Sequence, residues 1–112
     1  MHELGIAKSL MSVVLEKAKE KKGESISKIV VVVGTLAGVT ADALRFGFET
    51  VISETIAEDA ELIIEEVQAM AYCAGCKTSM GVGKYDLLCP KCEGILEIKS
   101  GRELYVKEFE IE

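Results

Sequence analysis

The chain has 112 residues, of which 49% are hydrophobic and 29% are charged, and its net charge at pH 7 is −6. This composition is typical of a small globular protein, and the negative charge argues against nucleic acids, which bind clustered lysines and arginines. No apolar stretch approaches the roughly 18 residues that cross a bilayer, and the first residues lack the layout of a signal peptide, so we expect a cytoplasmic protein with no membrane partner.

Residues 4 to 22 are predicted to form an amphipathic helix. Its apolar positions recur at helical spacing and polar residues fall on the opposite side; the apolar positions are Leu4, Ala7, Met11, Val14 and Ala18. The last turn is basic and Gly23 follows it, which predicts that the helix ends there with the glycine as a left-handed cap.

Residues 25 to 36 contain the β-branched run IVVVV, which is typical of a strand that is buried on both faces. Thr40 is the predicted N-cap of a second helix, whose buried face would hold Leu44, Phe48, Val51, Ile52 and Thr55. Residues 53 to 59 would close this helix and turn the chain.

Two more strands are predicted, at residues 60 to 72 and 104 to 111. The element order favours an α+β fold, in which two helices pack on a three-stranded β-sheet. The cysteine segment is then an insert before the last strand. We expect one domain from residues 1–72 plus 101–112 and a second from residues 73–100.

The four cysteines form two C-x2-C pairs, Cys73 with Cys76 and Cys89 with Cys92. The two cysteines of each pair can bind one metal ion from a tight turn, called a knuckle. Two such knuckles supply the four tetrahedral ligands of a closed zinc site, a zinc ribbon. Gly75 and Gly94 are expected to provide the unusual backbone angles of the two turns. With four protein thiolates, no coordination position stays open, so such a zinc ion would be structural.

Other states of the cysteines are compatible with the spacing. Two disulfides would suit an oxidising compartment, but a cytosolic chain is kept reduced. Iron in a rubredoxin-like site would use the same four ligands and would indicate electron transfer.

His2 is the only histidine. A single terminal histidine is often without function, but directly after the first residue it can offer its imidazole, its amide nitrogen and the α-amine of Met1 to one ion. Nitrogen-rich, square-planar coordination suits Ni²⁺ or Cu²⁺.

The start Met1-His2-Glu3-Leu4, the two C-x2-C pairs and the αβαβ pattern between them resemble the HypA/HybF family of hydrogenase nickel incorporation proteins. The likeness runs over essentially the whole chain. It implies a nickel-binding domain with His2 as ligand, together with the Met1 amine and the backbone amides of His2 and Glu3. It also implies that Cys73, Cys76, Cys89 and Cys92 are the zinc ligands.

The resemblance further implies a metallochaperone that cooperates with the nucleotide-hydrolysing accessory protein HypB. Its cargo, Ni²⁺, would go to the large subunit of [NiFe] hydrogenase, and a homodimer is compatible with this role. An enzyme is disfavoured because no Ser/His/Asp set or phosphate-binding glycine loop is present. A nucleic-acid-binding zinc ribbon should carry a basic, aromatic surface, and only Tyr72 and Tyr85 lie in or beside this one.

Overall fold

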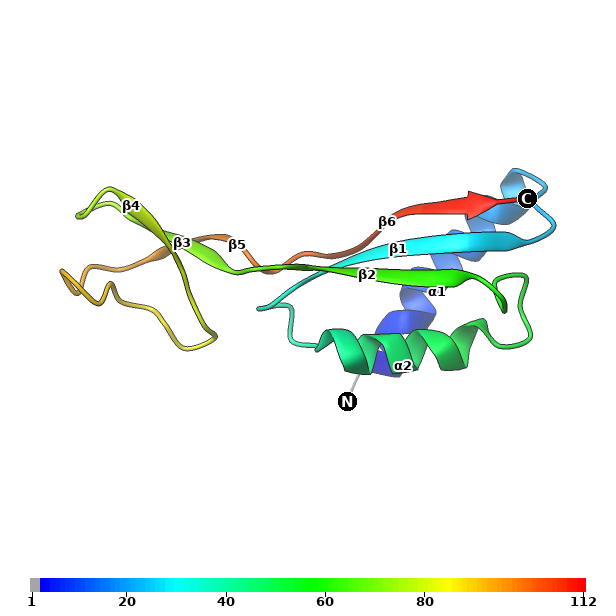
Figure 1. Ribbon diagram of the computed structural model, residues 1–112, viewed down its shortest axis with the longest axis horizontal. Coiled ribbons are helices and arrows are strands. Elements are labelled where there is room, and N and C mark those ends of the chain that lie inside the picture. Colours follow the sequence, from blue (N-terminus) through cyan, green and yellow to red (C-terminus); the bar gives the residue numbers. More distant parts are fainter. Residues whose placement is uncertain (1–2) are drawn as a thin grey trace.

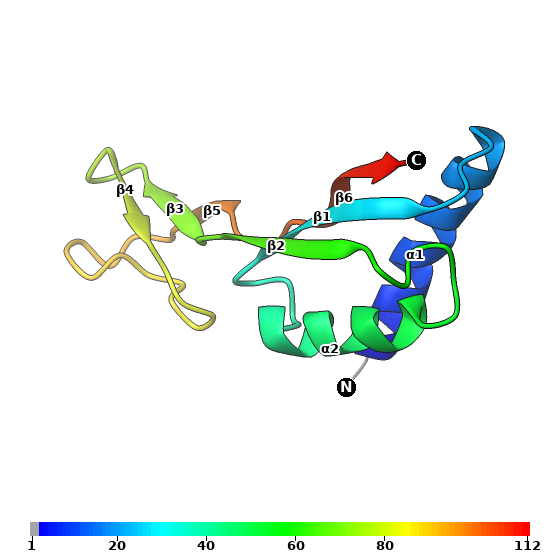
Figure 2. The same cartoon turned by 45° about the vertical axis from the view of Figure 1, so that its right-hand side comes forward.

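The computed structural model describes residues 3–112 and shows an elongated molecule of 55 × 26 × 18 Å with two parts (Figures 1 and 2). The body contains helices α1 (Glu3–Glu20) and α2 (Ala41–Ile52) and strands β1 (Ile26–Gly34), β2 (Glu61–Val67) and β6 (Leu104–Ile111). The ribbon contains β3 (Met70–Cys73), β4 (Thr78–Gly81), β5 (Glu97–Ser100) and the loops between them. Each part has its own three-stranded sheet.

Helix α1 buries one stripe of small and apolar side chains, Ala7, Met11, Val14 and Ala18, as its sequence period predicts. The helix ends two residues before the predicted position. The amide of Gly23 donates to the carbonyl of Ala18 (2.9 Å) and the amide of Lys22 to that of Lys19 (3.0 Å), which is a Schellman motif. The left-handed residue is Lys22 (φ 57°), so the prediction of Gly23 in that role was wrong.

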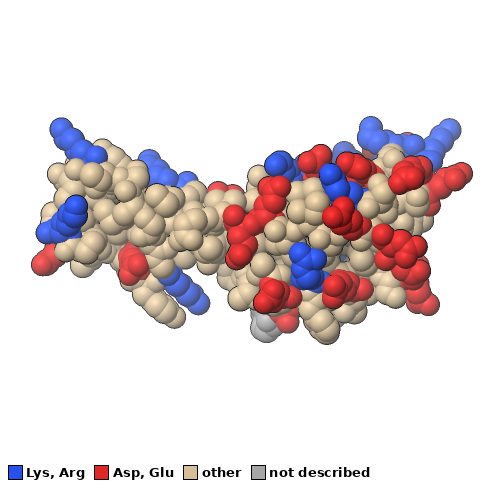
Figure 3. Space-filling view, viewed as in Figure 1, with Lys and Arg blue, Asp and Glu red and all other residues tan. Residues whose placement is uncertain are grey.

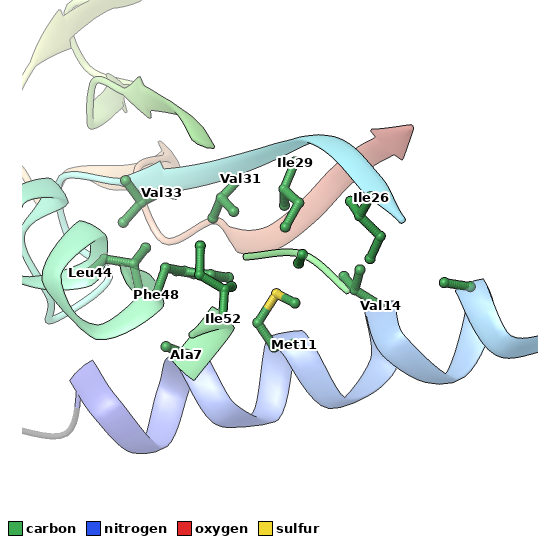
Figure 4. Close-up of a cluster of buried hydrophobic side chains, with 12 residues drawn as sticks. Ala7, Met11, Val14, Ile26, Ile29, Val31, Val33, Leu44, Phe48 and Ile52 are labelled. Atoms are coloured by element: carbon green, nitrogen blue, oxygen red, sulfur yellow. The ribbon is translucent and has the colours of Figure 1, made fainter. Parts of the chain in front are cut away.

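Strand β1 lies at the centre of the body's sheet, parallel to β2 and antiparallel to β6. Its residues Ile29, Val31 and Val33 face the two helices (Figure 4). Val30 and Val32 alternate with them and are also buried. The predicted burial of both faces of this strand is therefore confirmed.

Helix α2 connects the parallel strands β1 and β2 and lies beside α1 on the same face of the sheet (Figure 2). It begins at the predicted cap, where the hydroxyl of Thr40 accepts a hydrogen bond from the amide of Ala43 (3.1 Å). Leu44, Phe48 and Ile52 complete the core between the helices and the sheet. The two-helix, three-stranded body that the sequence predicts is confirmed.

The strand predicted at residues 60 to 72 is two strands in two different sheets. β2 ends at Val67 in the body, and β3 begins at Met70 in the ribbon. Between them, the amide of Ala69 donates to the hydroxyl of Thr35 (3.0 Å) and its carbonyl accepts from the amide of Val82 (3.0 Å). Ala69 therefore bonds to the body on one side and to the ribbon on the other.

The ribbon has a core of its own, which the sequence did not predict. Strand β3 pairs with both β4 and β5, and six buried residues pack around the sheet: Ala69, Ala71, Cys73, Val82, Cys89 and Leu96. Leu36 follows β1 in the chain and packs against this cluster, so the body contributes a side chain to the ribbon.

A narrow neck joins the two parts (Figure 3). A Cβ atom on Gly34 would overlap the backbone of Gly101, and one on Gly101 would lie 2.6 Å from the Cβ of Ala69. Gly101 also has a φ of 118°, which only glycine adopts readily. The amide of Leu36 donates to the carbonyl of Gly101 (2.6 Å). Glycines are thus required where the three segments cross.

Acidic side chains gather on the body in the view of Figure 3, whereas the charged side chains seen on the ribbon are mostly basic. Among the residues that the structure describes, no helix is long and apolar enough to span a membrane.

Candidate metal centre

The four cysteine sulfurs meet at the end of the ribbon. Cys73 is the last residue of β3 and Cys76 lies in the turn after it, whereas Cys89 and Cys92 lie in the connection from β4 to β5. Their Sγ atoms all lie within 4.8 Å of one another. The fold therefore brings together two pairs that are separated in sequence.

The two knuckles have the same local geometry. In the first, Cys73 pairs with Thr78 across the hairpin of β3 and β4. In the second, the amide of Cys89 donates to the carbonyl of Gly94 (2.8 Å). The residue after each second cysteine, Lys77 (φ 55°) or Glu93 (φ 61°), has the left-handed conformation.

The prediction that Gly75 and Gly94 supply these backbone angles was therefore wrong. Within the described residues, the glycines with positive φ are Gly38 and Gly101. Gly75 and Gly94 instead leave room for sulfur, since a Cβ atom on them would lie 3.3 and 3.2 Å from the Sγ of Cys92.

The sulfur distances fit a tetrahedral metal site. The Sγ atoms of Cys73 and Cys92 are 3.4 Å apart, and those of Cys76 and Cys89 are 3.8 Å apart. Four sulfurs at about 2.3 Å from a central zinc ion would be separated by about 3.8 Å. A disulfide needs about 2.05 Å, and all four cysteines are free thiols here.

Backbone amides point at three of the sulfurs. The amide of Cys76 donates to Sγ of Cys73, that of Lys91 to Cys89 and that of Gly94 to Cys92, each at 3.4 Å. Such donors stabilise the thiolate, which is the form that binds metals.

The pKa values within the cluster differ because each thiol has different partners. The backbone N–H groups of Cys92 and Lys91 lower the pKa of Cys89 to about 6. Hydrogen bonds with the side chains of Cys92 and Cys89 raise the pKa of Cys76 to about 12. Protons and a metal ion would therefore compete for the same four sulfurs.

Within the described part of the chain, this cluster is the group of ligating side chains that could hold a metal ion, and it contains only cysteine. Four protein ligands leave no open position for water or a substrate. The arrangement suits a structural metal and offers no catalytic position.

Met1 and His2, the side-chain and amine ligands of the second predicted site, lie outside the described residues. Glu3 is the first residue of α1 and is half-buried in the body. Of the predicted ligand residues that the structure describes, Glu3 lies in the body and the four cysteines lie in the ribbon.

Sequence reasoning missed a close contact at the start of α1. Gly47 of α2 is buried there, and a Cβ atom on it would lie 2.8 Å from the carbonyl oxygen of Glu3. The available signal was a glycine in the middle of an amphipathic helix, which indicates close backbone approach.

Comparisons with known proteins agree over the whole chain. The family described as "Hydrogenase/urease nickel incorporation, metallochaperone, hypA" matches residues 1–111. The hydrogenase maturation factor HypA of Chlorobaculum tepidum is 42% identical over 113 residues, and the factor of the same name from Caldanaerobacter subterraneus is 32% identical over 114 residues. Both alignments cover 100% of each chain.

Two solved structures have the same fold. The solution structure of the Ni metallochaperone HypA from Helicobacter pylori has a TM-score of 0.67 and 25% identity, and covers 99% of this chain and 97% of its own. A solution structure of a HypA protein has a TM-score of 0.69 and 26% identity, and covers 99% of this chain and 96% of its own. The likeness therefore includes the body and the ribbon together.

Proposed function

Because the chain belongs to the HypA family of hydrogenase and urease nickel-incorporation metallochaperones, we propose that it carries Ni²⁺ to the large subunit of [NiFe] hydrogenase. The observation that carries this proposal is the extent of the match, which includes the N-terminal residues, the body and the four-cysteine cluster in one alignment. The members of this family are maturation factors and not enzymes.

The proposed nickel site is the N-terminus. Its ligands are the imidazole of His2, the amine of Met1 and the backbone amide nitrogens of His2 and Glu3, a nitrogen-rich set that suits square-planar Ni²⁺. Helix α1 begins at Glu3, so the last of these proposed ligands belongs to the first residue of a helix in the body.

The ion proposed for the ribbon is structural Zn²⁺, held by Cys73, Cys76, Cys89 and Cys92. Their tetrahedral spacing and the family to which the chain belongs support this choice. A rubredoxin-like iron site would need the same ligands, and the colour of the purified protein distinguishes it. The proposed nickel-binding domain is residues 1–72 plus 101–112, and the proposed zinc-binding domain is residues 73–100.

Transfer of a metal ion requires partner proteins. We propose that the chain works in the cytoplasm with a HypB-type nucleotide-hydrolysing protein. The hydrogenase large subunit is the final recipient of nickel. The maturation role of the family supports this proposal.

The first prediction tests the nickel ligands. Acetylation or extension of the N-terminus converts the amine of Met1 into an amide, and His2→Ala removes the imidazole. Either change should weaken nickel binding at least tenfold, because each removes a nitrogen donor from the chelate. Calorimetric titration with Ni²⁺ of the untagged protein and both altered forms measures the effect.

Zinc content serves as the control for this experiment. Both altered forms should keep one zinc ion per chain by elemental analysis, since the ribbon uses only cysteine. If the extended protein binds nickel as tightly as the untagged one, the amine is not a ligand. If His2→Ala does so as well, the proposed site is wrong.

A further inference from the structure

Helices α1 and α2 approach each other closely at Gly47. A Cβ atom on this residue would lie 2.8 Å from the carbonyl oxygen of Glu3, 3.1 Å from its carbonyl carbon and 3.3 Å from the Cβ of Ala7. Non-bonded carbon and oxygen atoms do not approach to 2.8 Å without repulsion. The absence of a side chain therefore lets α2 lie directly against the backbone of the first residue of α1.

This contact has a cost for α2. Glycine inside a helix destabilises it by roughly 1 kcal/mol relative to alanine. Gly47 lies between the exposed Phe46 and the buried Phe48, in the middle of a twelve-residue helix. This cost is offset because a glycine at position 47 lets α2 pack closely against Glu3.

We propose that Gly47 is a positioning residue for the N-terminal nickel site. This inference rests on the proposed function, in which the backbone amide of Glu3 is one of the ligands. By packing against the carbonyl group of Glu3, α2 fixes the orientation of this residue's backbone.

Square-planar chelation makes such positioning important. The ligand nitrogens must lie in one plane with the metal, and functional constellations of this kind tolerate displacements of only about 0.5 Å. A methyl group at position 47 would contact backbone atoms of Glu3, which cannot rotate away as a flexible side chain can. The first turn of α1 and the middle of α2 would have to move apart.

The second prediction is that Gly47→Ala weakens nickel binding about tenfold or more. The visible circular dichroism spectrum of the nickel-saturated protein should change as well, because it reports the ligand geometry. The zinc content should stay at one ion per chain. Titration and spectroscopy of the full chain, with Ni²⁺ alone as the probe, measure these effects.

Gly5→Ala is the matched control. Gly5 lies in the same first turn of α1, but a Cβ atom there would meet nothing within 4 Å. This variant adds the same methyl group next to the site without touching α2. It should keep the nickel affinity and spectrum of the wild type.

A second control separates positioning from general stability. Ala18→Gly removes a buried methyl group at the far end of α1 and should lower the stability of the same helix. If Ala18→Gly weakens nickel binding and alters the spectrum as much as Gly47→Ala does at an equal loss of stability, Gly47 has no positioning role. Wild-type affinity and spectrum in Gly47→Ala would overturn the inference as well.

Failure of the proposed function gives a different result. In that case His2→Ala would bind nickel like the wild type, whatever the behaviour of position 47. If His2→Ala loses nickel and Gly47→Ala does not, the nickel site stands and only the role of Gly47 is excluded.

Discussion

Lys77 and Glu93 hold a backbone conformation that their side chains disfavour. Both follow the second cysteine of a knuckle, with φ values of 55° and 61°. A left-handed conformation costs an ordinary residue about 1–2 kcal/mol. Metal binding in small zinc modules contributes about 10–16 kcal/mol, which is enough to hold both knuckles in this shape.

The third prediction follows from this strain. Lys77→Gly and Glu93→Gly should each stabilise the zinc-loaded protein by about 0.5–1 kcal/mol, because glycine adopts positive φ without a steric penalty. Denaturation of the zinc-loaded protein measures the effect. Lys91→Gly is the control, since Lys91 does not have a positive φ and glycine there should only add freedom to the unfolded chain. Equal destabilisation by all three substitutions would contradict the argument.

The absence of a Cβ atom at two glycines also determines the shape of the four-cysteine cluster. A Cβ atom on Gly75 or Gly94 would lie 3.3 or 3.2 Å from the Sγ of Cys92, which is closer than most such contacts in proteins. The amide of Gly94 donates to the same sulfur (3.4 Å). The position of this ligand therefore depends on its two glycine neighbours as well as on its own rotamer.

At the scale of elements, α2 has two functions. It covers the sheet with Leu44, Phe48 and Ile52, and it contacts the start of α1 through Gly47. Its own start depends on Thr40, whose hydroxyl accepts from the amide of Ala43. Without this cap an unpaired donor would remain in the first turn.

The fourth prediction is that Thr40→Ala destabilises the protein by about 1 kcal/mol, the usual cost of losing an N-cap. The midpoint of thermal unfolding should fall by about 3–6 °C. Thr40→Ser keeps the accepting oxygen and should lie close to the wild type. An unchanged midpoint in Thr40→Ala would show that the cap does not contribute.

At the scale of the whole molecule, two hydrophobic cores are separated by a narrow neck. The larger core lies between the helices and the sheet of the body, and the smaller one surrounds β3 in the ribbon. The neck contains the crossing of Gly34, Ala69 and Gly101. Leu36 is the side chain that reaches from the body into the smaller core.

The fifth prediction concerns removal of the metal from the ribbon. Its core holds only six buried residues, so chelation of zinc should cause amides between residues 70 and 100 to lose protection from hydrogen exchange. Amides of β1 and of the two helices should keep theirs, because their core contains no metal ligand. Hydrogen exchange with mass spectrometry, with and without chelator, measures both regions.

The boundary of this effect should lie at the neck, near Leu36. Zinc-loaded His2→Ala is the control, and its ribbon should stay protected. If the body loses protection together with the ribbon, the two cores unfold as one cooperative unit and their separation is wrong.

The sequence alone determined the local elements. The helical period of α1, the β-branched run of β1 and the cap at Thr40 appear where they were predicted, because each depends on neighbours in the chain. The C-x2-C spacing likewise predicted the clustering of four sulfurs. The nickel ligands at the N-terminus stay a prediction.

Only the tertiary structure decided which sheet each strand joins. Residues 60 to 72 read as one apolar strand, yet β2 and β3 separate at Ala69 because β2 pairs with β1 in the body and β3 pairs with β4 and β5 in the ribbon. The close approach of Gly47 to Glu3 also depends on a partner that is distant in sequence. The spacing of apolar residues indicates which face of a helix or strand is buried, but tertiary packing determines which other element covers that face.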